Sequence, residues 1–496
     1  MTRSNEAQIK HRSVTESAAR GLVWLVGQTF ASRLVQAATQ ILLARILSPP
    51  EFGLIGLTFA ITAVIGVLFS FGFDDVILQR GRNILLWLRT AFCLSFIVGF
   101  FGFCAMVAAA PIGAYLFNQP NITGLVIVAS LSVPIMSVGT ILNAVLRARL
   151  QFNILASASF LEILITSALS LCFAGLGFGA YSFVLPLPIV ALLRVIALAV
   201  FVKPKLKRKI TVLRLKILIP AASASLGARL LVTLISQADT AILGLFSSKA
   251  SVGLYYFAFR IAVQPLRAIA SSYSNVLFPA LTQFRNDPQR QLRAAINSAM
   301  MVSAFIMPLC VYQASISGSM IRLLFKPEWW PSTVIVQILS LGLAFDACSW
   351  SAGSLMVARG QFRRNFMFSA LGAPIIIVLI LLGAALYSSV GVACAVFAYY
   401  FMAGPFICFL VIFRGQGSAI NNLFRLYAAP FLLSSLSAFA AWFPIHQIDD
   451  EVLYLVLFSI TYFCLYSVLF WYLMPATRDQ LLIKFRAVMP QRFFSH

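Results

Sequence analysis

The sequence predicts an all-α integral membrane protein with 14 transmembrane helices. We expect two parallel six-helix lobes, related by a pseudo-two-fold axis along the membrane normal, plus two C-terminal helices. Three observations lead to this fold class. The 496 residues are 61% hydrophobic and only 10% charged, which is too apolar to cover a soluble globule. Long apolar runs recur along the chain, and the two halves of the chain resemble each other.

The apolar runs define the predicted spans. A run of about 20 apolar residues is long enough to cross the hydrocarbon core of a bilayer as a helix. Such runs lie at residues 22–47, 51–72, 85–109, 122–142, 155–174, 178–202, 217–246, 252–278, 295–316, 332–356, 366–387, 389–413, 427–445 and 452–474.

Basic residues gather in alternate loops. Of the 37 Lys and Arg residues, 27 lie on one predicted side, which also holds both termini and the loop with Arg147 and Arg149. Only Lys249, Arg322 and Lys326 lie in the opposite loops. By the positive-inside rule, both termini are cytoplasmic. The net charge of +23 therefore indicates topology and attraction to anionic membrane lipids. No nucleic-acid partner is expected.

The internal repeat predicts the domain organisation. Residues 34–61 match residues 234–261 at a shift of 200, and the turn at 148–152 returns at 358–362. Span one thus matches span seven, so the halves share one orientation in the membrane. We expect the following parts: a cytoplasmic segment 1–21, an N-lobe 22–202, a basic linker 203–216, a C-lobe 217–413, two further helices within 427–474 and an amphipathic cytoplasmic tail 475–496.

Three arginines inside the apolar spans are candidates for substrate binding. Arg33, Arg229 and Arg267 lie at similar distances from their external turns. A buried arginine costs about 2.5 to 3.5 kcal/mol on insertion scales, so it needs a partner, water or a ligand. We expect these three to face a cavity between the lobes and attract an anionic group such as a phosphate, which suits the guanidinium fork. In the alternative, they neutralise Asp346 or lie in cytoplasmic vestibules.

The remaining intramembrane charges suggest structural roles. Asp239 and Arg260 lie at matching depth on either side of one hairpin turn, which predicts an ion pair. Glu162 and Arg194 are placed in the same way, although Arg194 can also snorkel to the interface. Asp346 lies near the middle of its span. It is either a proton- or cation-coupling carboxylate or the counter-ion of an arginine.

No motif indicates catalysis or a bound cofactor. The eight cysteines form no CxxC pair, and the three histidines form no HExxH motif, so no metal site is predicted. A phosphate-binding GxxxxGK[ST] loop is absent from the sequence. We therefore expect neither an enzyme nor a cofactor.

Several segments resemble the Wzx-type polysaccharide exporters of the multidrug/oligosaccharidyl-lipid/polysaccharide superfamily. They are LARILSPPEFGLIGL at 43–57, DTAILGLFSSKASVGLYYFAFRI at 239–261, FPAL at 278–281 and the repeated AR-x-QF turns. The resemblance spans nearly the whole chain. It implies a bacterial inner-membrane flippase with a cationic central cavity. Such a protein moves an undecaprenyl-pyrophosphate-linked oligosaccharide by alternating access, for O-antigen, capsule or exopolysaccharide assembly.

The resemblance also implies partners, and it leaves alternative functions open. The implied partners are the lipid-linked oligosaccharide, membrane lipids, and polysaccharide polymerase and chain-length machinery. A lipid II flippase or a multidrug/cation antiporter of the same superfamily would share the architecture, but a cation antiporter should carry acids in its cavity. From another class, a membrane polysaccharide polymerase or ligase would be expected to carry a large external loop. The longest external loop predicted here, residues 317–331, is short.

Overall fold

The computed structural model confirms the all-α class. It describes residues 27–28, 31–69, 84–149, 151–203, 212–267, 277, 281–284, 286–415, 417–448, 450–475, 477–480 and 482, in which all regular elements are helices. Eleven helical segments in these ranges are long and apolar enough to cross a membrane. The count of 14 and the two-lobe arrangement stay predictions. The segment 1–21, most of the linker 203–216 and most of the tail 475–496 lie outside the described residues.

The chain divides into two compact units, Met1–Gln237 and Ala238–His496. The division falls inside one long helix, α10 (Val212–Phe246). The lobe boundary predicted in the linker therefore stays a prediction, and each unit is described by itself.

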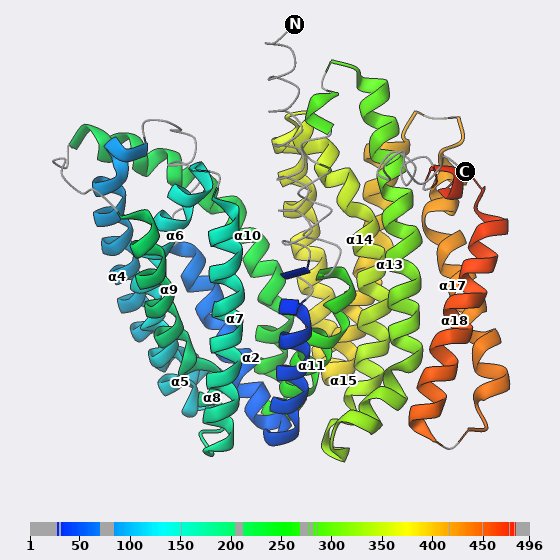
Figure 1. Ribbon diagram of the computed structural model, residues 1–496, viewed down its shortest axis with the longest axis horizontal. Coiled ribbons are helices and arrows are strands. Elements are labelled where there is room, and N and C mark those ends of the chain that lie inside the picture. Colours follow the sequence, from blue (N-terminus) through cyan, green and yellow to red (C-terminus); the bar gives the residue numbers. More distant parts are fainter. Residues whose placement is uncertain are drawn as a thin grey trace, which may run out of the picture. The chain divides into compact units, whose positions relative to one another are not determined.

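The first unit is a bundle of apolar helices. Residues 31–46 are helical, and the elements after them are α2 (Pro49–Leu68), α4 (Ile84–Leu116), α5 (Asn121–Ser130), α6 (Ser132–Ala148), α7 (Phe152–Gly175), α8 (Tyr181–Val184) and α9 (Pro186–Val202). Figure 1 shows α4, α6 and α9 side by side, with α7 along α9. Their contact buries Leu88, Ile141, Val145 and Leu198 completely.

The second unit is built around three neighbouring helices. Its elements are α11 (Lys249–Ala262), α13 (Pro288–Leu324), the 3₁₀ turn η2 (Pro327–Trp329), α14 (Ser332–Ala358), α15 (Phe362–Cys408), the π turn η3 (Phe409–Phe413), α16 (Ala419–Leu423), the π turn η4 (Phe424–Ala428), α17 (Ala429–Ile445) and α18 (Glu451–Leu473). α14 packs along both α13 and α15, while α17 and α18 pack on each other and on α13 (Figure 1).

α15 is broken where the sequence predicts a turn between two spans. Tyr387 and Ser388 leave the helical conformation, and Ser388 has φ +53°. The two parts of α15 approach closely at Gly383 and Gly391, where a Cβ on either residue would clash with the carbonyl oxygen of the other. Glycine is needed at both positions because it alone lets the two backbones come so near.

Tyrosines dock α18 on α13. Pro308 lies inside α13 and has no N–H, so the carbonyl of Ala304 loses its partner in the helix. The hydroxyl of Tyr466 donates to that carbonyl at 2.8 Å, and the hydroxyl of Tyr462 donates to the Pro308 carbonyl at 2.8 Å. A backbone acceptor that would otherwise be orphaned in an apolar surrounding is thus satisfied from the neighbouring helix.

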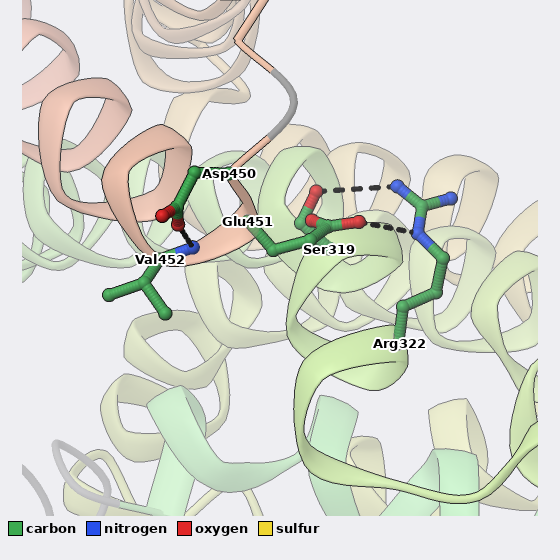
Figure 2. Close-up of polar contacts among 5 residues, drawn as sticks. All are labelled: Ser319, Arg322, Asp450, Glu451 and Val452. Carbon is green, nitrogen blue, oxygen red and sulfur yellow. Dashed lines mark hydrogen bonds and ion pairs between the residues drawn. The ribbon is translucent and has the colours of Figure 1, made fainter.

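An ion pair joins the same two helices at one end. Arg322 of α13 donates from Nε to Glu451 of α18 at 2.8 Å, and its Nη2 lies 3.4 Å from the hydroxyl of Ser319 (Figure 2). The carboxylate of Asp450 caps α18 by accepting from the N–H of Val452 at 2.8 Å (Figure 2). α18 is therefore held on α13 both near Pro308 and at the end that carries Arg322.

Candidate functional site

A polar cavity of about 440 Å³ opens within the first unit. Residues of the first helix, α6 and α7 line it: Gln28, Ser32, Arg33, Gln36, Arg147, Leu155, Ala156, Ser159, Phe160 and Ile163. Gln28, Ser32 and Gln36 follow one another at intervals of four, so they share one face of a helix. The same spacing on α7 turns Leu155, Ser159 and Ile163 toward the cavity. Helical periodicity in the sequence thus turns a polar face of the first helix and a largely apolar face of α7 toward the cavity.

The cavity is cationic. Its lining residues include two arginines, Arg33 and Arg147, and no acid among the residues that the structure describes. Arg33 Nη1 lies 3.4 Å from Gln36 Oε1, which orients the guanidinium along the wall. Ser32 donates to the Gln28 carbonyl at 2.8 Å. Within the described ranges, the buried Gln28 Oε1 accepts no hydrogen bond. The cavity therefore offers positive charge and the hydroxyl of Ser159 to a ligand.

The structure separates the three arginines that the sequence groups together. Arg33 lines the cavity, whereas Arg229 on α10 and Arg267 after α11 are not among its lining residues. Arg229 is half-buried in the first unit and Arg267 is exposed in the second. Their common role stays a prediction. Sequence reasoning assigned Arg147 to the cytoplasmic loops and missed its place in the cavity, although the adjacent polar positions of α7 were a usable signal.

Glu162 and Arg194 lie together. Glu162 of α7 and Arg194 of α9 form an ion pair, and Arg194 Nη2 also donates to Asn143 of α6 at 3.4 Å. The two charged side chains are 25% and 22% exposed, so water reaches both only in part. This contact connects three helices of the first unit and explains how two charges are accommodated among apolar residues.

Asp239 has hydroxyl and amide partners. It is buried, and its carboxylate accepts from the Tyr255 hydroxyl at 2.8 Å and from the Thr240 N–H at 2.6 Å. Arg260, the partner that the sequence suggests, donates to the Tyr256 hydroxyl at 3.3 Å and lies over that ring. The sequence gives no direct signal for Tyr255, because an aromatic residue in an apolar span is ordinarily a packing residue.

Asp346 lies inside α14 of the second unit. The indole N–H of Trp350 donates to its carboxylate at 3.2 Å, one helical turn away. Tyr400 of α15 interacts electrostatically with both Asp346 and Asp239. The second unit therefore contains two acids near one tyrosine. Whether Asp346 couples transport to an ion or neutralises an arginine stays a prediction.

Metal ligands do not gather in the described part of the chain. No group of three or more His, Cys, Asp or Glu side chains lies close together there. The cysteines at 310, 348 and 408 are buried in the second unit, and each lies on a helix that the sequence predicts as a span.

Comparison with known proteins finds similarity to proteins of polysaccharide biosynthesis and transport. It is 22% identical over 331 residues to the succinoglycan biosynthesis transport protein ExoT of Rhizobium meliloti, an alignment that spans 65% of each chain. It is 23% identical over 433 residues to the lipopolysaccharide biosynthesis protein WzxC of Escherichia coli, which covers 85% of this chain and 86% of WzxC.

A solved structure shares the fold. The lipid II flippase MurJ in an inward closed conformation superposes with a TM-score of 0.75 over 91% of this chain and all of that one, at 15% identity. A family model described as polysaccharide biosynthesis protein matches residues 42–334, which is more than half of the chain. This multi-pass membrane protein therefore belongs to the polysaccharide biosynthesis protein family.

Proposed function

We propose that this protein is a transporter that moves a lipid-linked oligosaccharide across the bacterial inner membrane for the assembly of a surface polysaccharide. Membership of the polysaccharide biosynthesis family supports this function, as do the names of ExoT and WzxC. The many apolar spans are consistent with a protein that acts within the bilayer. The substrate is an undecaprenyl pyrophosphate that carries a short glycan.

The observation that carries the proposal is the cationic cavity of the first unit. An arginine binds a phosphate through two parallel N–H···O hydrogen bonds, and a low-dielectric surrounding strengthens that contact. The hydroxyl of Ser159 is suited to sugar hydroxyls. Phe160 offers an apolar wall to a sugar ring or to the first isoprene unit. The long polyprenyl chain stays in the lipid.

The transport cycle follows from the predicted architecture. Two six-helix lobes with cytoplasmic termini rock around a site between them, and Arg229 and Arg267 join Arg33 in holding the anionic headgroup. Asp346 is the candidate for coupling to a cation gradient. A polysaccharide polymerase and chain-length machinery receive the transported product on the outer side.

The rivals make different demands. A lipid II flippase would have the same fold. The similarity to the MurJ structure supports this rival at the level of the fold. A cation antiporter would require acids in its cavity, whereas the described lining of the cavity in the first unit has two arginines and no acid. A polymerase or ligase would need catalytic groups that face its substrate.

Deletion of the gene tests the function. The lipid-linked sugars of the deletion strain are extracted, identified by mass spectrometry and assigned to a leaflet with a membrane-impermeant lectin. We expect a glycan on undecaprenyl pyrophosphate to accumulate in the cytoplasmic leaflet, and the surface polysaccharide to be lost. Accumulation of lipid II would favour the lipid II flippase, and accumulation of nothing would contradict transport.

Complementation then tests the cavity. Arg33→Gln should restore surface polysaccharide at least about tenfold less well than the wild type, because it removes a charge-assisted contact to the headgroup. Arg290→Gln is the matched control, since Arg290 is exposed in the first turn of α13 and is not a lining residue of the cavity. Equal complementation by both variants would exclude the cavity as the transport site.

A further inference from the structure

We propose that Arg147 binds the phosphate group of the substrate together with Arg33 in the cavity of the first unit. This inference rests on the proposed function and deepens it, because it names the residue that joins Arg33 and the chemical group that both recognise. The sequence had placed Arg147 among the loop charges that set the topology.

The position of Arg147 carries the inference. Arg147 lies in the last turn of α6, and its exposed side chain lines the same cavity as Arg33. Among the described residues it makes no hydrogen bond or ion pair. Its five N–H donors are therefore available to a ligand in the cavity.

Arg149 shows what a structural arginine looks like in the same turn. It lies two positions further along the chain, caps α6 and donates from Nη1 to the Val202 carbonyl at the end of α9, at 3.3 Å. Residues two apart on a helix point to different faces. One arginine of this turn therefore ties two helices together, while the other is directed into the cavity.

Charge balance identifies the ligand. Arg33 and Arg147 line one cavity of about 440 Å³, and the described part of its lining contains no acid. Two guanidinium groups in one cavity repel each other, and an anion between them removes the repulsion and gains two charge-assisted contacts. A pyrophosphate has two phosphoryl groups, so each arginine can take one. Neutral lipids and cations gain nothing from this arrangement.

The same cavity holds neutral polar groups beside its two charges. The described residues that line it all belong to the first unit. The hydroxyl of Ser159 and the amide of Gln36 line the cavity with the two arginines and can accept or donate to the sugar that follows the phosphate. The site selects for a phosphorylated lipid before it selects for a particular glycan.

Binding measurements on the full-length protein in detergent test the inference. The probes are undecaprenyl pyrophosphate and undecaprenol, which share the same lipid chain but differ in charge. Affinity is measured by native mass spectrometry and by thermophoresis for the wild type, Arg147→Gln, Arg147→Lys and the control Arg149→Gln, with melting temperatures recorded for each.

We expect Arg147→Gln to weaken binding of undecaprenyl pyrophosphate by about tenfold or more, because one charge-assisted contact is lost. Arg147→Lys should lose about threefold, since lysine keeps the charge without the bidentate geometry. Arg149→Gln should stay within about twofold of the wild type, because Arg149 does not line the cavity. Undecaprenol should bind equally to all four proteins.

Two results would overturn the inference. The first is equal affinity of the wild type and Arg147→Gln for undecaprenyl pyrophosphate, and the second is an equal loss for undecaprenol. Should Arg147→Gln not fold, Arg147→Lys decides, and unchanged binding by that variant would also reject the proposal. Failure of the proposed function would give a different result. The wild-type protein would still bind undecaprenyl pyrophosphate through Arg147, but deletion of the gene would leave the lipid-linked glycans of each leaflet unchanged.

Discussion

Arg149 and Arg359, 210 positions apart, have the same backbone conformation. Each follows the last residue of its helix with φ −83° and ψ 0°. The N–H of Arg149 bonds to the Val145 carbonyl at 3.0 Å, and that of Arg359 bonds to the Leu355 carbonyl at 3.0 Å. The arginine of the repeated AR-x-QF sequence therefore ends its helix in the same way at both places.

A second pair of turns agrees with the first. α2 begins at Pro49 and α11 begins at Lys249, as the repeat at a shift of 200 requires. The serine before each helix, Ser48 or Ser248, is extended, with ψ of 160° and 156°. The local geometry at the start of α2 in the first unit thus recurs at the start of α11 in the second.

Removal of the arginine at either turn should lower stability by different amounts. Arg359 donates from Nε to Gln291 at 3.0 Å and from Nη2 to the Pro288 carbonyl at 3.4 Å, which ties its turn to the start of α13. Among the described residues, the side chain of Arg149 makes only the contact to the Val202 carbonyl. We expect Arg359→Ala to cost about 1 to 2 kcal/mol, and Arg149→Ala less than about 1 kcal/mol. Thermal unfolding in detergent measures both, and an inverted order would contradict the prediction.

A double-mutant cycle tests the role of Tyr466. Tyr466→Phe leaves the Ala304 carbonyl without a donor, because Pro308 cannot supply one. We expect a cost of about 1 to 3 kcal/mol in the wild type. In a Pro308→Ala background, the new N–H can satisfy Ala304, so the same substitution should cost less than half as much.

The control for this cycle is Tyr454→Phe, in the same row of tyrosines on α18. Its hydroxyl makes no hydrogen bond to the described residues, so it should lose little stability in either background. Equal costs for Tyr466→Phe with and without Pro308 would show that the hydroxyl contributes by packing alone.

The two ion pairs should differ in strength because they differ in exposure. Glu162→Gln leaves the Arg194 guanidinium without its counter-ion among apolar helices that admit little water. We expect this change to lower the free energy of unfolding by about 1 to 3 kcal/mol, which is less than for a fully buried ion pair. Glu451→Gln breaks the pair with Arg322, whose side chain is 53% exposed, and should cost less than about 1 kcal/mol. Unfolding at low and high salt measures both, and a stronger salt dependence at Glu162 would argue against partial burial there.

The apolar runs of leucine, valine and phenylalanine determine the fold class of this chain independently of its tertiary structure. Long apolar runs can only be helices in lipid, because every backbone group must then be bonded within its own segment. The same reasoning placed the turn before Lys249 and the break near Ser388, where polar or flexible residues interrupt the runs. The repeat was visible because duplicated turns keep their sequence.

Only tertiary structure decided which charged and polar groups meet. Arg147 and Arg149 look alike in the sequence, yet one lines the cavity and the other binds the end of α9. Asp239 takes Tyr255 as a partner across the hairpin. Contacts between helices depend on rotation about each helix axis, and in lipid an apolar residue is tolerated both inside the bundle and outside it. Composition is therefore informative about spans, whereas the pairing of their few polar groups depends on how the helices pack.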